Sequence, residues 1–480
     1  MKGLVLLRLV IRHGIIPRLS TPTMIDSPDK SLYPCQNDNE WMWHKVRSNA
    51  CFACRAILIT LIFPFGTTVQ SRFIPRTIRR LILMGGSVLK GELKDLPPNL
   101  TYIFFGYSYN QRIEKNLLSK NLTHVFLNGR FDHPVDNNLP EKLTHLVVGY
   151  WFNQTVDHLP SSLTHLTLGY MFNRPLEKLP PSLTHLTLGK KFNQRLVFDG
   201  SSPWANPLKE LTHLTLGEDF DLPVDCLPLS LTYLVLGKYF NQPINNLPQK
   251  LIHLTLGDGF NQSIDELPQK LTHLTLGDGF NQRVDELPQN LTDLVLGDGF
   301  DLPVDKLPVS LISLALGRMF NQPVNNLPEK LTHLTLGDHF NQTMDNLPSG
   351  LTHLTTGYEF NQSVDNLPKK LTHLTLGWYF NQPIDNLPPG LTHLTLGLCF
   401  NQSINKLPLS LTHLNLGQYF NQPVDNLPPT LTHLTLGSNF VQPLYKLPLS
   451  LNHLTLRNTL YGLSLNHLKD LLPKLTIKWS

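Results

Sequence analysis

Residues 251–262 read LIHLTLGDGFNQ and residues 271–282 read LTHLTLGDGFNQ, so the chain restates itself after 20 residues. Looser copies precede the regular ones, and a short copy closes the chain, which makes about twenty-one units. Self-similarity at this period is typical of stacked units, none of which can bury its apolar side alone. The phrase L-x-x-L-x-L-G and its looser forms begin at Ala56, Ile78, Leu100, Leu122, Leu143, Leu163, Leu183 and Leu211, then every 20 residues to Leu451, and again at Leu472.

Each unit is expected to form one coil of a solenoid. The fourth and sixth letters of LTHLTLG alternate with Thr and His, which is the period of a β-strand. The seventh letter is Gly, which permits a sharp or left-handed turn, and Asn128 stands there in one unit. Pro at the eighteenth letter makes a helical return unlikely. The sequence therefore predicts a parallel β-sheet of about twenty short strands, with extended or 3-10 return segments and a cap at each end.

Two further letters predict the interior of the coil and one of its turns. The tenth letter is Phe in every unit from Phe131 to Phe440, as a spine filling the interior would require. The apolar fourteenth and seventeenth letters should lie beside this spine. Asn at the eleventh letter is expected to form a ladder whose side chains satisfy backbone groups of the next coil.

The phrases FNQPIDNLP (380–388) and FNQPVDNLP (420–428) resemble the FNIP repeat. This family is similar to leucine-rich repeats, and its members occur in social amoebae and in giant viruses that infect amoebae. The resemblance covers roughly residues 100–456 and rests on a motif that recurs sixteen times. It implies a leucine-rich-repeat-like solenoid with a protein-binding role, no enzymatic activity and no cofactor.

The chain divides into segments according to how closely each one matches the repeat. Residues 56–121 carry divergent initial repeats, and residues 122–456 carry the FNIP array, with an inserted loop at about 197–208. Residues 457–480 are predicted to cap the array, because their leucines are spaced as in an amphipathic helix before a closing strand. Residues 1–55 form an N-terminal segment of uncertain fold.

The N-terminal segment carries an alternative function. Many FNIP-repeat proteins begin with an F-box, which docks to a cullin-type ubiquitin ligase, so the resemblance implies possible ligase components as partners. Residues 1–55 lack the LP-x-E-[IL] phrase of that module, and a cryptic F-box would be needed. The chain would then be a substrate receptor of the ligase.

Composition and charge exclude several partner classes. The first 100 residues hold 14 Lys or Arg and 6 Asp or Glu, whereas the array is near neutral with mixed charge and shows no nucleic-acid footprint. Arg72, Arg76, Arg79 and Arg80 alternate with apolar letters, as on the exposed face of an early strand. The apolar opening is interrupted by Arg8 and is too short to span a membrane. A monomeric protein of the cytoplasm, or of the host cytoplasm if viral, is expected.

The cysteines allow one hypothesis of a metal site, in the N-terminal segment. Five cysteines without a ladder along the repeat favour a reducing compartment. Cys51 and Cys54 have the spacing of a zinc knuckle, with Cys35 and His44 as further weak candidates, although reduced cysteines in a cap explain the same residues. No G-x-S-x-G, P-loop or H-E-x-x-H phrase is present, so no catalytic residue is assigned.

The third letter of the phrase is His in fourteen units and should line the open face of the sheet. Neighbouring imidazoles about 5 Å apart would repel one another when charged, so the column is expected to be mostly neutral at pH 7. Three interpretations stay open. The column is a ladder of metal ligands, a pH-sensitive or partner-reading surface, or a letter copied from the founding unit.

The column is interrupted in the middle of the array. Tyr233, Asp293 and Ser313 replace His at the third letter, and Val235, Val295 and Ala315 replace Thr at the fifth. The inserted loop adds Trp204, an aromatic residue that could contact a partner. Aromatic, acidic and apolar letters together are typical of interface anchors. The predicted partner-binding set is therefore Tyr233, Val235, His253, His273, Asp293, Val295, Ser313 and Trp204.

Overall fold

The computed structural model describes residues 60–196, 208–457 and 472–479. All of these residues belong to one compact unit, residues 54–480. Its main sheet has 21 strands, and the strand of each coil pairs in parallel with the strand of the next, from Thr60–Phe63 to Thr476–Trp479. A second sheet pairs two further strands, Thr68–Gln70 and Val88–Lys90. The fold is a leucine-rich-repeat-like solenoid, in which each coil contributes one strand.

The strands are short, and most of them begin at the third letter of the repeat. The first coils hold β1 (Thr60–Phe63), β2 (Thr68–Gln70), the 3-10 helix η1 (Ser71–Phe73), β3 (Arg80–Leu83), β4 (Val88–Lys90), the 3-10 helix η2 (Leu93–Asp95) and β5 (Tyr102–Phe105). The array holds β6 (His124–Leu127), β7 (His145–Val148), β8 (His165–Thr167), β9 (His185–Thr187), β10 (His213–Thr215), β11 (Tyr233–Leu236), β12 (His253–Leu256), β13 (His273–Leu276), β14 (Asp293–Leu296), β15 (Ser313–Leu316), β16 (His333–Thr335), β17 (His353–Thr355), β18 (His373–Thr375), β19 (His393–Thr395), β20 (His413–Asn415), β21 (His433–Leu436), β22 (His453–Leu456) and β23 (Thr476–Trp479).

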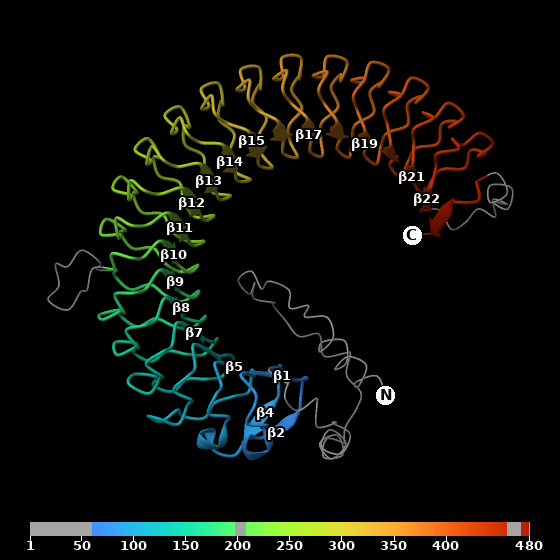
Figure 1. Cartoon of the computed structure of the whole chain (residues 1–480). Coiled ribbons are helices and arrows are strands. Elements are labelled where there is room, and N and C mark those ends of the chain that lie inside the picture. The colour runs from blue at the N-terminus through green and yellow to red at the C-terminus, as the bar shows by residue number, and fades with distance from the viewer. Residues whose placement is uncertain (1–59, 197–207, 458–471, 480) are drawn as a thin grey trace. The chain divides into compact units, whose positions relative to one another are not determined.

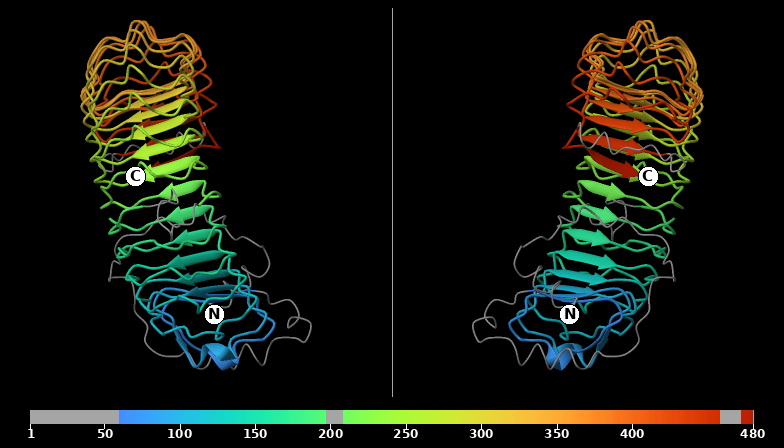
Figure 2. Two further views of the ribbon diagram at one scale, coloured as in Figure 1. Left: turned by 90° about the vertical axis from the view of Figure 1, so that its left-hand side faces the viewer. Right: turned by 90° about the vertical axis from the view of Figure 1, so that its right-hand side faces the viewer.

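The coils of this unit stack side by side along a curve (Figure 1). The strands lie on the inner side of the curve and the return segments on the outer side. Seen from the side, the strands run parallel to one another like the rungs of a ladder (Figure 2). None of the described residues forms a helix with the length and apolarity needed to cross a membrane.

Burial alternates along each strand as the sequence predicts. In β13 the leucines at the fourth and sixth letters, Leu274 and Leu276, are buried, whereas His273 is exposed and Thr275 half-buried. The first letter of the phrase is buried too, and Val284 and Leu287 fill the return side of this coil. Every coil thus encloses its own apolar interior, which the two neighbouring coils cover.

The registers of the first and last strands differ from the prediction by two residues. Thr60 pairs with Arg80, which places the first unit at residue 58 instead of Ala56. Thr476 pairs with His453, so Ile477 takes the fourth letter that was expected at Leu475. A shift of two residues leaves the same side chains on each face, so alternation alone could not distinguish the two registers.

Two tight turns close each coil. In the coil that begins at Leu271, Phe280 N donates to Gly277 O at 3.2 Å, and Leu291 N donates to Pro288 O at 3.0 Å. Of the sharp and the left-handed turn that the seventh letter permits, the structure has the sharp one, because the positive-φ glycines among the described residues all lie at other letters. Close approach explains the glycine instead. A Cβ on Gly317 would lie 2.2 Å from the carbonyl oxygen of Gly297 in the preceding coil.

Gly317→Ala is therefore expected to destabilise the array by about 1–3 kcal/mol, the usual cost of overpacking. Gly390→Ala is the matched control, since its Cβ would meet its nearest atom at an ordinary 3.5 Å. Thermal unfolding followed by circular dichroism measures both variants. Equal melting temperatures for the two would contradict close approach as the reason for the glycine.

The phenylalanines of the tenth letter form the predicted spine. All sixteen are buried, and adjacent rings stack nearly parallel. Phe260 and Phe280, for example, have centroids 6.2 Å apart and planes inclined by 7°. One ring thus fills each coil and packs on the ring above and below, which excludes water from the whole length of the stack.

The asparagines of the eleventh letter form the predicted ladder. Asn281 N donates to Asn261 Oδ1 at 2.9 Å, and each following coil repeats the bond. Asp301 takes the same place without breaking the ladder, because its carboxylate oxygen accepts from Asn321 N at 2.9 Å. Two coils read FDL in place of FNQ, at Phe220 and Phe300. In both, the Asp carboxylate accepts the same backbone hydrogen bond as the Asn side chain does elsewhere, so the turn is unchanged.

Several predictions concern residues outside the described part of the chain. Trp204 lies there, and so do the weak zinc candidates Cys35, His44, Cys51 and Cys54. The predicted capping helix falls mostly on residues 458–471, which are also outside. Leu472 is described, and it is buried in the turn before β23.

Candidate partner-binding surface

The open face of the sheet carries the third and fifth letters of every unit. Strand pairing places residues of the same letter directly opposite one another, so each letter forms a continuous row across the sheet. His353, for example, lies between His333 and His373. The side chains of these rows are half-buried by their neighbours, yet they remain on the surface.

The histidines of the third letter stack on one another. In the first run, from His124 to His213, ring centroids are 4.1 to 4.2 Å apart and the planes are inclined by 11 to 13°. A second run extends from His333 to His453 with similar spacing. Between the runs the column is interrupted over β11–β15, where the only adjacent histidines are His253 and His273.

A hydrogen-bond chain sets the tautomer of these histidines. Thr164 Oγ1 donates its single proton to Thr144 O at 3.1 Å, so the same oxygen can only accept from His165 Nδ1, 2.9 Å away. Nδ1 therefore carries the proton and Nε2 keeps a lone pair in the neutral ring. Twelve column histidines have this bond to a preceding Thr, and the two without it, His253 and His453, follow Ile252 and Asn452.

Ten of the fourteen column histidines have a lowered pKa, which keeps them neutral at pH 7, and this has two physical causes. Burial against the neighbouring rings lowers the pKa of His145 and of His185 to about 4, and repulsion between adjacent imidazolium charges adds to this. Burial is also the first cause that lowers the pKa of eight further members, and repulsion from neighbouring positive charges adds to it in all of them except His213. These members are His124, His165, His213, His253, His353, His393, His413 and His433.

The stacked geometry disfavours the metal interpretation of the column. A ring lone pair lies in the plane of its ring, so parallel rings such as those of His393 and His413, inclined by 13°, direct their Nε2 lone pairs side by side. Two ligands of one metal ion must instead converge on a point about 2 Å from each nitrogen. Within the described residues, no group of three or more His, Cys, Asp or Glu side chains could hold a metal ion.

The structure brings the predicted mid-array residues together. Tyr233, His253, His273, Asp293 and Ser313 follow one another across β11–β15 in the row of the third letter. Val235 and Val295 lie in the adjacent row of the fifth letter, two strand positions closer to the turn. We call this surface over β11–β15 the mid-array patch.

Two members of the mid-array patch were missed in the sequence. Ile252 and Ile312 replace Thr at the second letter, and 38% and 44% of their surfaces are exposed. With Val295, 41% exposed, they add exposed apolar surface to the patch at letters that are Thr in most of the array. The signal was available, because a break in the second letter is as visible as a break in the third.

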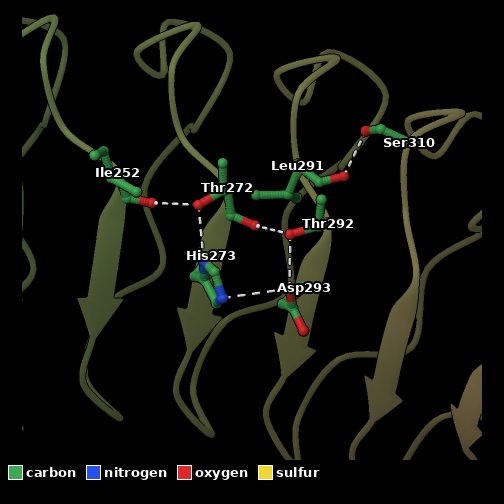
Figure 3. A network of polar contacts seen from close by, with 7 residues as sticks. All are labelled: Ile252, Thr272, His273, Leu291, Thr292, Asp293 and Ser310. Carbon is green, nitrogen blue, oxygen red and sulfur yellow. Dashed lines mark hydrogen bonds and ion pairs between the residues drawn. The ribbon is translucent and has the colours of Figure 1, made fainter.

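A polar network includes Ile252, His273 and Asp293 of the mid-array patch (Figure 3). Asp293 Oδ2 is 3.4 Å from His273 Nε2, an ion pair when the imidazole is protonated, and it accepts from Thr292 Oγ1 at 2.7 Å. Thr292 Oγ1 also approaches Thr272 O at 3.1 Å. Asp293 thus occupies the place of an imidazole and puts the one carboxylate of this row on the surface. The patch combines an acid with apolar side chains.

Sequence and structure comparisons identify relatives of this chain. The profile described as FNIP Repeat matches nine segments, which are residues 90–130, 131–171, 172–200, 221–259, 260–297, 301–339, 320–358, 360–399 and 400–436. A comparison with curated proteins finds no match.

Three solved structures are similar to this chain to different extents. CroV588 of a giant virus, described as a novel circular LRR protein structure, shares 36% identity over 85% of this chain and 76% of that chain, with a TM-score of 0.58. YopM from Yersinia enterocolitica shares 25% identity over 67% of this chain and 75% of that chain, with a TM-score of 0.44. The internalin InlF from Listeria monocytogenes shares 19% identity over 60% and 88%, with a TM-score of 0.46.

The matched segments cover more than half of the chain, and they coincide with the coils that carry the phenylalanine spine and the asparagine ladder. CroV588 exceeds 30% identity over most of both chains. The repeat solenoid and the sequence profile therefore agree, and the chain belongs to the FNIP-repeat family.

Proposed function

We propose that this chain is a non-enzymatic protein-interaction module and that the mid-array patch is its partner site. The partner is a protein, and the chain acts as a monomer in the cytoplasm, or in the host cytoplasm if it is viral. Repeat stacks of this kind present extended surfaces to other macromolecules. The open face offers a continuous surface of this type, with one segment that differs from the others.

The proposal is supported by the positions at which the recurring residues of the repeat are replaced. The buried tenth letter is never changed within the array, whereas the breaks of the open face are concentrated on five adjacent strands. These breaks expose Ile252, Val295 and Ile312 beside Asp293. Apolar anchors around a specific charged group are typical of binding hot spots.

The test restores the array's own letters, which the coil is known to accommodate. Tyr233→His, Asp293→His, Ile252→Thr and Ile312→Thr are compared with the reverse changes His393→Tyr and His413→Asp on the distant run. Partners are first identified by purification of the tagged chain from amoebal cytoplasm and mass spectrometry, and their affinities are then measured by calorimetry. We expect the restored letters at hot spots to weaken binding about tenfold or more each. Equal losses in both sets of variants would reject the patch.

A second candidate function is acid responsiveness of the same face. The specific observation in its favour is the neutral histidine column, whose Nε2 atoms accept hydrogen bonds at pH 7 and would donate them when protonated. A partner bound to the column at pH 7 would then be released in acid. The affinity of such a partner should fall as the pH is lowered from 7 toward 4, where His145 and His185 take up protons, and unchanged affinity would contradict the idea.

The role of ubiquitin-ligase receptor depends on residues 1–55, which lie outside the described part of the chain. A version that lacks these residues separates this role from plain binding. Cullin-ligase subunits that co-purify with the full chain and not with the shortened one would establish the receptor role. Partners retained by both versions would belong to the solenoid.

A further inference from the structure

A hollow of about 270 Å³ lies on the open face near the beginning of the sheet, far along the chain from the mid-array patch. It is lined by Arg80 of β3, Thr101 and Tyr102 at β5, and Thr123 and His124 at β6. These residues occupy the second and third letters of three adjacent coils. The volume is small for a cofactor and suits a single side chain or a small ligand.

Arg80 is the unusual member of this hollow. Its guanidinium lies over the ring of Tyr102, with the central carbon 4.8 Å from the ring centroid. Its Nε is the one buried side-chain nitrogen without a hydrogen-bond acceptor among the described residues, and no described acid pairs with it. The Nε–H of Arg80 is thus a donor without an acceptor, and the N–H groups of a guanidinium form a fork that matches a carboxylate.

Among the described residues, the open face around Arg80 carries no negative charge to neutralise it. The second, third and fifth letters of β3 and of β5–β10 include no Asp or Glu. His124 is neutral at pH 7, and the Arg80 charge, after burial, helps to lower the pKa of its imidazole. This part of the open face therefore complements an anion.

An apolar strip adjoins the hollow. The fifth letter, which is Thr in most of the array, is Phe104 in β5 and Phe126 in β6. The ring centroids of Phe104 and Phe126 are 5.8 Å apart, and those of Tyr102 and Phe126 are 5.1 Å apart. All three rings are half-exposed, so the cation and an aromatic surface meet at one place.

We propose that the hollow at Arg80 binds a carboxylate whose neighbouring apolar group packs on Tyr102, Phe104 and Phe126. In a protein ligand this is an acidic residue beside an apolar one, as in an acidic peptide. Arg80 accounts for the charge, and the aromatic strip accounts for the preference for a carboxylate with an apolar neighbour over a hydrophilic anion. The site is independent of the partner proposed for the mid-array patch.

Benzoate is a suitable probe, since it carries a carboxylate on an aromatic ring. The full-length chain is titrated with benzoate, and the ring resonances of His124 and the Nε–H resonance of Arg80 are followed by NMR. Benzamide, its neutral counterpart, and inorganic phosphate are titrated in parallel. We expect saturable shifts with benzoate at millimolar concentration, little change with benzamide, and weaker binding of phosphate.

The variants assign the effect to one side chain. Arg80→Gln should weaken benzoate binding about tenfold or more, and Arg80→Lys, which keeps the charge, should weaken it less. Arg79→Gln is the control, because Arg79 precedes Arg80 and is exposed. Melting temperatures establish that each variant is folded. Equal binding of benzamide, tighter binding of phosphate, unchanged binding by Arg80→Gln, or no benzoate binding by the folded chain would each overturn the proposal.

Discussion

Phe240→Ala is expected to destabilise the protein by about 3–5 kcal/mol, the cost of deleting a large buried ring that its surroundings cannot replace. The Phe240 side chain is fully buried, and its ring stacks between Phe220 and Phe260 at centroid distances of 6.2 and 6.1 Å. Alanine would leave a cavity in the middle of the stack and remove ring contacts on two sides. Because each coil contacts only its neighbours, the loss should also weaken the coupling between the two halves of the array.

The measurement is urea unfolding at pH 7.5, with circular dichroism as the readout. Tyr239→Ala is the control, since Tyr239 is the adjacent residue of the same turn and is 55% exposed. Removal of that ring should change the free energy of unfolding by less than about 1 kcal/mol. A second, earlier transition in Phe240→Ala would show the loss of coupling. Similar midpoints for the two variants would contradict the spine as a source of stability.

Stability is expected to fall steeply when the pH is lowered from about 7 toward 4. The pKa of His145 and of His185 is about 4 in the folded chain, against 6.5 for an ordinary histidine. Below pH 6.5 the unfolded chain therefore binds protons that the folded column does not, and the free energy of unfolding decreases as the pH falls. Lowered pKa values along the column act in the same direction, so the effect accumulates over many coils.

Urea midpoints at pH 7.5, 6.5, 6.0 and 5.5 measure this dependence, in a window where carboxylates still contribute little. The double variant His145→Gln and His185→Gln should show a smaller fall in midpoint between the highest and lowest pH. His133→Gln, at a histidine outside the column, should retain the full fall. A constant midpoint of the unchanged protein across this range would contradict the neutral, stacked column.

Much of the fold could be predicted because each position of the repeat occurs in many units, and a residue type that is kept in all of them indicates a structural role. Leu274, Phe280 and Asn281 belong to letters whose recurrence indicated a strand, a spine and a ladder, and the structure confirms all three. The glycine of the seventh letter was recognised, but its reason was not. The close approach of Gly317 to the preceding coil is a contact between coils, which no single repeat contains.

The candidate sites were predicted less completely. The breaks at Tyr233 and Asp293 indicated the mid-array patch, since substitutions in an otherwise copied letter are visible in the sequence. Ile252 and Ile312 were missed because the second letter was not compared. The Arg80 hollow could not be predicted, because it depends on three coils whose letters differ from the consensus and on an arginine that finds no acid nearby.

The sequence by itself determined the period, the strand, the buried letters and the membership of a solenoid class, because each of these depends on the local pattern of one unit. The tertiary structure alone decided the register of the end strands, the stacking and tautomer of the histidines, and the unpaired state of Arg80. These depend on which atoms of neighbouring coils meet. The distance between atoms of two coils depends on how the units stack, and the sequence of a single unit does not specify this.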